Sequence, residues 1–334
     1  MKKNSIQFAK GFTPPTQEEC ISALCLDNNT QTIPKTLIAY PNIFLSLPKP
    51  QSSIDWLARN NEPREDYNKW LASIPNNILT TIQTQKIYLQ PIGDLTIPVE
   101  ILASFVRIFY PNTLVEVLPV LRIENNSITI TIPSTRRPTN KTIPLEWRHC
   151  HKLDTSKISP DQYSKGQYAV LPILHALYLS KPRDAFCVIG ITMEDLYHTK
   201  SDSFTVGSAR YKEKTAMFSF ARYNPCFGLI TTINTPAINT QTTLLLRSCK
   251  VLVHELGHLF GLIHCVWYDC CMNGSGNLDE DNRQPLHFCP VCLRKLQTIT
   301  NCDLKQRYET LLAFYKQYNF IEEIKWQQRL LQML

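Results

Sequence analysis

The sequence predicts an α/β fold with a twisted, mixed and mostly parallel sheet of five strands. A strand, a helix and a second strand follow one another in "IYLQPI" at 87–92, in an amphipathic segment that starts at Pro98, and in "LVEVL" at 114–118. This order is a βαβ unit, in which the two strands are parallel and the crossover is right-handed. The apolar run "AFCVIGI" at 185–191 extends the same pattern.

The other elements of this sheet are expected between residues 161 and 223. A helix is predicted near Asp161 to Tyr178, before the strand at 185–191. Two further strands, "SFTVGSAR" at 203–210 and "AMFSFARY" at 216–223, raise the number of strands to five. Residues 125–160 are rich in polar side chains, and we interpret them as an insertion within the sheet.

The chain is predicted to contain one central domain and two additional segments. Residues 1–84 are rich in proline and polar residues and form an N-terminal extension, part of which is expected to be mobile. The central domain covers residues 85–302. Residues 303–334 follow an amphipathic helical pattern, so we expect one or two helices that pack on the central domain.

The segment "HELGHLFGLIHC" at 254–265 contains histidines at the spacing of metal ligands. Residues four apart lie on the same face of a helix, so His254 and His258 can bind one metal ion. Glu255 lies near that face, where its carboxylate can hydrogen-bond a water on the metal without being a ligand. This pattern is typical of zinc sites that activate water.

A third histidine follows the helical pair. Gly261 lies three residues after His258 and three before His264, and glycine can end a helix in a left-handed conformation that turns the chain back. Three imidazoles leave the fourth position of zinc for water, which is the arrangement of a catalytic site. The alternative is three unrelated surface or core histidines, and the full H-E-x-x-H-x-x-G-x-x-H spacing argues against it.

The helix that carries this motif is predicted to start shortly after residue 238. Leucines at helical spacing run through "TQTTLLLRSCKVLV" at 240–253, and either Asn239 or Thr240 offers an N-cap. One face of this helix is therefore expected in the core, and the other at the metal.

A second metal site is predicted from the 12 cysteines. In a reducing compartment, clustered cysteines are more often metal ligands than disulfides, and the C-x-x-C at Cys289 and Cys292 places two thiolates at zinc-binding spacing. A redox-active C-x-x-C and simple buried thiols are the competing interpretations. Cys271 is an alternative to Cys270 as a ligand. The predicted ligands of this structural zinc are Cys265, Cys270, Cys289 and Cys292.

These motifs resemble the archaemetzincin family of zinc metallopeptidases, in particular its eukaryotic, archaemetzincin-2-like members. The signature of that family joins the long histidine motif to a cysteine set and a C-x-M turn, and the present chain has "HELGHLFGLIHC", Cys270, Met272 and "CPVC" in this order. A looser likeness extends upstream through "IYLQPIGDL", "DAFCVIGITMEDLY" and "AMFSFARYNP".

The resemblance implies a metzincin-like fold with a zinc-binding active-site helix. It implies that the strand at 203–210 is an antiparallel edge strand above the cleft, where it would pair with an extended peptide. It further implies that Glu255 is the general base and that Met272 is the Met-turn residue, an apolar floor beneath the imidazoles. The ligands that it assigns to the catalytic zinc are His254, His258 and His264.

The predicted function is zinc-dependent hydrolysis of peptide bonds. Zinc polarises the substrate carbonyl and its bound water, and Glu255 takes the proton of that water and passes it to the leaving amine. The family resemblance offers aminopeptidase activity as an alternative to endopeptidase activity. The acidic stretch "LDEDN" at 278–282 is a candidate for binding the substrate ammonium, and a solvated loop is the competing interpretation. The alternative is a zinc-stabilised peptide- or protein-binding protein with little or no peptidase activity. Candidates for stabilising the oxyanion are Tyr268, Tyr223 and Arg222.

The expected cofactors are two zinc ions per chain, one catalytic and one structural, and the expected partner is a peptide or protein substrate. The net charge of +7 is spread without a basic cluster interleaved with aromatic residues, so no nucleic-acid binding is expected. The start "MKKNSIQFAK" lacks a signal peptide, and no run of about 18 apolar residues is present, so we expect no membrane contact and an intracellular, cytoplasmic monomer.

Overall fold

The computed structural model describes residues 12–26, 42–75, 78–134, 137–149, 166–227 and 237–334. The chain forms two compact units. The sheet unit contains residues 80–107 and 113–252, and the helical unit contains residues 1–79, 108–112 and 253–334. The division of the chain at residues 84 and 302 stays a prediction.

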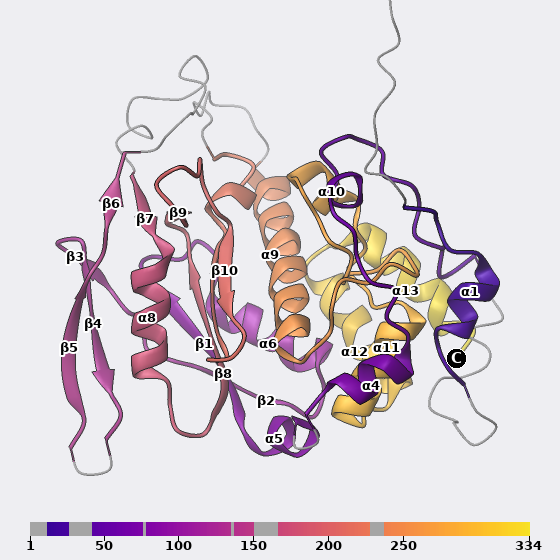
Figure 1. The fold of residues 1–334 in the computed structure, drawn as a ribbon, viewed down its shortest axis with the longest axis horizontal. Helices are drawn as coiled ribbons and strands as arrows, with labels where there is room; N and C mark the ends of the chain where they lie inside the picture. Colours follow the sequence, from indigo (N-terminus) through magenta and orange to yellow (C-terminus); the bar gives the residue numbers. More distant parts are fainter. Residues whose placement is uncertain (1–11, 27–41, 76–77, 135–136, 150–165, 228–236) are drawn as a thin grey trace, which may run out of the picture. The chain divides into compact units, whose positions relative to one another are not determined.

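The sheet unit is built on a five-stranded sheet with the strand order β10-β11-β8-β1-β2 (Figure 1). Strands β11, β8, β1 and β2 run parallel to one another. Strand β10 lies at the edge and pairs antiparallel with β11. The α/β fold class and the mixed, mostly parallel sheet are thereby confirmed. The strands are β1 (Lys86–Ile92), β2 (Leu114–Val117), β8 (Ala185–Thr192), β10 (Gly207–Arg210) and β11 (Thr215–Ser219).

Two helices of this unit follow from the predicted crossovers. Helix α6 (Val99–Phe109) connects β1 to β2, and α8 (Val170–Ser180) precedes β8, whose eight residues are all buried. Gly190 in β8 permits a close approach of its neighbours, because a Cβ there would lie 2.4 Å from Met217 Sδ and 2.8 Å from Leu177 Cδ1. The apolar sequence of β8 is therefore explained by its central place in the sheet.

The described strands of the polar segment 125–160 lie between β2 and β8 in sequence but pair outside the main sheet. Strands β3 (Ile123–Glu124), β4 (Ser127–Ile132) and β5 (Thr139–Pro144) form a separate antiparallel sheet. Buried and exposed residues alternate along β4, and its inward isoleucines share a core cluster with α8. A third small sheet contains β6 (Trp147–Arg148), β7 (Gln167–Ala169) and β9 (Asp195–Tyr197).

Three predicted boundaries are corrected by the structure. Helix α8 begins only at Val170, because β7 occupies 167–169; residues 161–165 of the predicted helix lie outside the described residues. Strand β10 is shorter than 203–210 and begins at Gly207. Strand β11 ends at Ser219, whose Oγ accepts the N–H of Ala221 and so starts the 3₁₀ helix η1 (Ala221–Tyr223).

Helix α9 (Ala237–Leu259) starts in the sheet unit and ends in the helical unit. The predicted N-cap at Asn239 or Thr240 is wrong, since the helix already begins at Ala237. Pro236 directly precedes this start, and proline is tolerated at the beginning of a helix but not inside it.

The described helices that lie wholly in the helical unit come from both ends of the chain. Two C-terminal helices are present, and the hydroxyl of Tyr315 donates to the carbonyl of Leu286 while the rings of Trp326 and His287 stack at 3.7 Å. The described helices that lie wholly in this unit are α1 (Gln17–Ser22), α3 (Trp56–Arg59), α4 (Tyr67–Ser73), α10 (Leu278–Arg283), α11 (Pro290–Thr300), α12 (Leu304–Gln317) and α13 (Ile321–Leu331).

Among the described residues, no helix is both long and apolar enough to pass through a lipid bilayer.

Candidate functional site

The three predicted imidazole ligands lie together in the helical unit, and we call His254, His258 and His264 the histidine group. Their ligand atoms all lie within 4.8 Å of one another. The first two lie one turn apart on α9, which ends at Leu259. Gly261 then adopts a φ of +91°, a left-handed conformation that favours glycine, and the chain turns back so that the third imidazole meets the first two.

Main-chain oxygens fix the tautomers of the two helical histidines. His254 Nδ1 lies 2.8 Å from the carbonyl oxygen of Cys271, and His258 Nδ1 lies 2.7 Å from that of Leu262. A carbonyl oxygen can only accept, so both Nδ1 atoms carry the proton and donate. The Nε2 atom of each ring therefore presents its lone pair.

The third histidine has a carboxylate partner. His264 Nδ1 lies 2.7 Å from Oε1 of Glu62, and the indole Nε1–H of Trp56 donates to the same oxygen at 2.6 Å. No sequence pattern marks Glu62 or Trp56 as part of the site, because both lie about 200 residues before the motif and neither belongs to a recognised metal-binding spacing.

The geometry of the histidine group fits a bound cation. The Nε2 atoms of His254 and His258 are 3.0 Å apart, and two lone pairs at this distance repel each other unless a positive ion lies between them. Burial lowers the pKa of both imidazoles, and the neighbouring histidines lower it further, so both rings are neutral. Neutral imidazole nitrogens in a group of three are the donor set of catalytic zinc.

Glu255 follows the first histidine on α9 and is partly buried. Burial raises the pKa of its carboxyl to about 7, and the charge of Asp281 acts in the same direction. A cation in the histidine group would act in the opposite direction, because it favours the carboxylate. A carboxyl with a pKa near neutrality can accept a proton and release it again.

Met272 lies beneath the histidine helix and is fully buried. A Cβ at Gly257 would lie only 2.6 Å from Met272 Sδ and 3.2 Å from the hydroxyl of Tyr110. That hydroxyl donates to the carbonyl of Val253 at 2.6 Å. Glycine at position 257 thus lets the methionine sulfur pack directly on the helix backbone between the two helical histidines.

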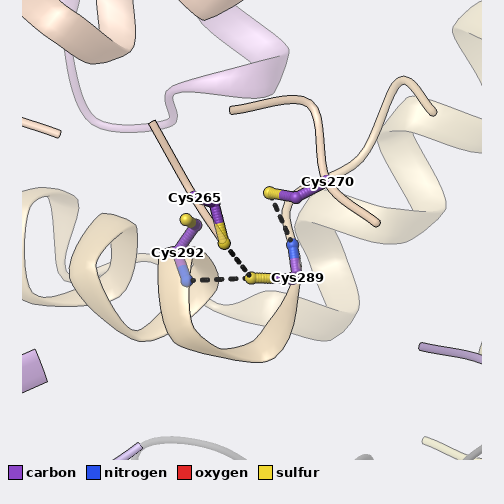
Figure 2. A group of neighbouring side chains, drawn as sticks. All are labelled: Cys265, Cys270, Cys289 and Cys292. Carbon is purple, nitrogen blue, oxygen red and sulfur yellow. Dashed lines mark hydrogen bonds between the residues drawn. The ribbon is translucent and has the colours of Figure 1, made fainter. Parts of the chain in front are cut away.

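Figure 2 shows the four predicted thiols pointing toward one another, and we call Cys265, Cys270, Cys289 and Cys292 the cysteine group. All four are buried, and their Sγ atoms lie within 4.8 Å of one another. The C-x-x-C spans the start of α11, where Cys289 is the N-cap residue and its Sγ accepts the N–H of Cys292 at 3.5 Å. The group contains Cys270 in place of the alternative Cys271, whose carbonyl instead faces the histidine group.

The surroundings of the cysteine group favour thiolates that bind a metal ion. Cys270 Sγ accepts backbone N–H groups from Met272 at 3.4 Å and from Cys289 at 3.3 Å. Burial nevertheless raises the pKa of Cys289 and of Cys270, whereas hydrogen bonds from the other thiols lower the pKa of Cys265. Several buried thiolates can coexist only if a cation balances their charge, and four sulfur ligands form a closed, structural type of zinc site.

The side chain of Asn273 stabilises the loop that contains Cys265 and Cys270. Its Oδ1 accepts the N–H of Cys270 at 2.7 Å, and its Nδ2 donates to the carbonyls of Cys265 at 2.7 Å and Tyr268 at 3.0 Å. Through these bonds, the asparagine directly after Met272 has a structural role. Two of the residues predicted as candidates for stabilising the oxyanion are engaged elsewhere in the structure. Tyr268 is buried, and the guanidinium of Arg222 pairs with the carboxylate of Asp195 at 2.7 Å in the sheet unit.

The part of the chain that contains the two groups is similar to a known protein family. Residues 164–298, which include both groups, match the model of peptidase family M54. This part of the chain is similar to that family, the archaemetzincins. The resemblance predicted from the motifs is confirmed.

Curated archaemetzincins of mammals are among the relatives. Archaemetzincin-2 of Homo sapiens is 41% identical over 160 residues, which are 42% of this chain and 44% of that protein. Archaemetzincin-1 of Homo sapiens is 29% identical over 289 residues, which are 79% of this chain and 52% of that protein. The chain thus spans about half the length of the curated archaemetzincins that it matches.

Solved structures of archaeal archaemetzincins are also similar to this chain. The archaemetzincin of Archaeoglobus fulgidus, complexed with malonate, is 26% identical, covers 63% of this chain and 99% of its own, and has a TM-score of 0.39. The archaemetzincin of Methanopyrus kandleri is 26% identical, covers 69% of this chain and 99% of its own, and has a TM-score of 0.41.

Proposed function

We propose that this M54 protein is a metallopeptidase that binds a catalytic zinc ion in the histidine group and a structural zinc ion in the cysteine group. The observation that carries the proposal is the convergence of three imidazole ligand atoms beside Glu255 on α9. Three neutral nitrogen ligands leave one coordination position open, which a purely structural site would not require. The packing of Met272 on Gly257 supports membership of the metzincin clan.

Glu255 is the general base of the proposed reaction. A zinc ion held by His254, His258 and His264 would supply a Lewis acid for the scissile carbonyl and for the attacking water. Glu255 accepts the proton of the attacking water and then delivers it to the nitrogen of the leaving amine, so one carboxylate serves both steps. The rise in the pKa of its carboxyl to about 7 by burial supports this role.

An aminopeptidase preference is supported by α10, which lies between Met272 and Cys289 in the chain. The backbone N–H of Trp56 donates to Glu280 on this helix at 2.8 Å, and the ring of Trp56 lies 5.0 Å from that of His264. Asp281 is the next residue on α10, and its charge raises the pKa of Glu255. We infer that Asp281 binds the N-terminal ammonium of a peptide whose first amide bond lies at the histidine group.

The Asp281→Asn variant is therefore expected to lose roughly three- to tenfold in kcat/KM on peptides with a free N-terminus, as for a partly exposed ion pair. Peptides with a blocked N-terminus should show no such loss. The measurement is the turnover of a matched panel of free and N-acetylated peptides, with products identified by mass. Asp279→Asn, on the exposed side of the same helix turn, is the control.

The panel also tests the proposed function as a whole. Peptide cleavage by zinc-loaded wild-type protein is the expected result, and cleavage one residue from the N-terminus supports the aminopeptidase preference. Internal cleavage with equal rates on free and blocked peptides would contradict the role of Asp281. No cleavage of any peptide, in a protein that binds peptides tightly, would favour the zinc-stabilised binding protein.

A further inference from the structure

The N-terminal part of the chain contributes a side chain to the histidine group. Glu62 lies outside residues 164–298, the range that matches the family model. Its Oε1 accepts from Trp56 Nε1–H and faces His264 Nδ1 at 2.7 Å. An oxygen that already accepts from an indole N–H is an acceptor, so the Nδ1–H of the imidazole donates to it.

The segment that carries Glu62 is anchored at several points within the helical unit. A Cβ at Gly274 would lie 2.4 Å from the indole ring of Trp56, so this ring packs closely on the loop that precedes α10. Asp55, which is almost fully buried, pairs with Arg283 at 2.8 Å, and the backbone N–H of Trp56 donates to Glu280. The carboxylate of Glu62 is therefore held in place by the contacts of its own segment.

The same segment also pairs with the loop of the cysteine group. The N–H of Leu47 donates to the carbonyl of Trp267 at 3.2 Å, and the N–H of Asp269 donates to the carbonyl of Leu45 at 2.9 Å. These antiparallel bonds attach residues 45–47 to the chain between Cys265 and Cys270. Residues 42–75 thus contact both the histidine group and the loop that carries Cys265 and Cys270.

The three imidazoles differ in how they are oriented. His254 and His258 lie on a rigid helix, and both donate to main-chain oxygens. His264 lies in the loop after α9, and its partner is a side chain 202 residues away in sequence. A carboxylate on Nδ1–H fixes the ring orientation and makes the opposite nitrogen a stronger donor to a metal. The ligand with the least support from secondary structure has the charged partner.

We propose that Glu62 is a positioning residue for the catalytic zinc: it holds His264 in the ligating orientation, and Trp56 holds Glu62. The N-terminal segment is then an integral part of the metal centre, and the occupancy of the histidine group depends on it. This inference rests on the proposed function only in that zinc is the ion bound by the histidine group. It requires no assumption about substrate.

The test is the affinity of the full-length protein for its more weakly bound zinc ion, measured by competition with a chromophoric chelator. Glu62→Met keeps the side-chain volume but removes the acceptor, and its zinc dissociation constant is expected to rise roughly 10- to 100-fold. Glu62→Gln keeps an acceptor oxygen without the charge. Its zinc dissociation constant should therefore also rise, but by a factor several-fold smaller than that of Glu62→Met. Two internal references show that each variant is folded: its content of tightly bound zinc, and its melting temperature after the weakly bound zinc ion has been removed.

Glu309→Gln, an exposed residue of α12, is the matched control and should bind zinc as the wild type does. The cobalt-substituted protein gives a second readout, because the visible bands of cobalt report ligand geometry, and they should change in Glu62→Met and recover in Glu62→Gln. A folded Glu62→Met with the wild-type dissociation constant overturns the proposal. If that variant does not fold, an unchanged dissociation constant in Glu62→Gln overturns it. A wild type that binds zinc without peptidase activity refutes the proposed function and leaves this test valid.

Discussion

The Glu255→Gln variant is expected to lose roughly a hundredfold to ten-thousandfold in kcat while it keeps its fold and both zinc ions. Glutamine has nearly the same shape as glutamate but cannot accept the proton of the attacking water. Because the glutamate is not a ligand of the histidine group, metal content should not change. The loss therefore isolates general-base catalysis from metal binding.

The measurement is turnover of one peptide substrate by wild type and variant at equal zinc content. Glu309→Gln makes the same chemical change at an exposed position on α12 and should retain full activity. His258→Ala should instead lose the more weakly bound zinc, since it removes one of the three imidazoles. Equal turnover by wild type and Glu255→Gln would refute the role assigned to the carboxylate.

The Cys292→Ser variant is expected to lose one zinc ion and to melt roughly 10 °C or more below the wild type. Binding of zinc to a closed thiolate site is folding free energy, and losing even about 3–5 kcal/mol of it lowers the melting temperature of a unit of this size by that amount. The remaining thiols of the cysteine group would also stay buried without a cation to balance their charge. Scanning calorimetry and elemental analysis measure the two effects.

Cys271→Ser is the matched control for this prediction. Cys271 is as buried as Cys292 and lies next to Cys270, but its thiol is not a member of the cysteine group. Its replacement should cost only the roughly 1–3 kcal/mol of burying a hydroxyl, and both zinc ions should remain. A Cys292→Ser protein that keeps two zinc ions would contradict the assignment, as would a Cys271→Ser protein that loses one.

The parts of the fold and site that depend on local patterns were predictable from sequence. The parallel strands β1, β2 and β8 follow from apolar runs separated by a helical period, and the histidine group follows from the four-residue helix repeat and Gly261. The cysteine group follows from two short spacings. In each case the residues that must meet are close in sequence or are marked by a repeat with a known geometry.

The contributions of distant residues were not predictable in this way. Glu62 reaches His264 only because Trp56, Asp55 and Glu280 hold its segment in place, and none of these contacts leaves a periodic signal. The carbonyl oxygen that orients His254 comes from the main chain, which the side-chain sequence does not encode. Boundaries such as the start of α8 were missed because a short strand of the third sheet occupies residues 167–169, which were expected to be helical.

The most direct test of the account is a zinc titration of peptidase activity in protein that a chelator has freed of its more weakly bound zinc ion. The account predicts that this protein keeps one zinc ion and its fold but has no activity. Addition of about one equivalent of zinc per chain should restore peptide cleavage in wild type and none in Glu255→Gln. Cleavage that persists without the second ion, or a wild type that binds two zinc ions and cleaves no peptide, would contradict the account.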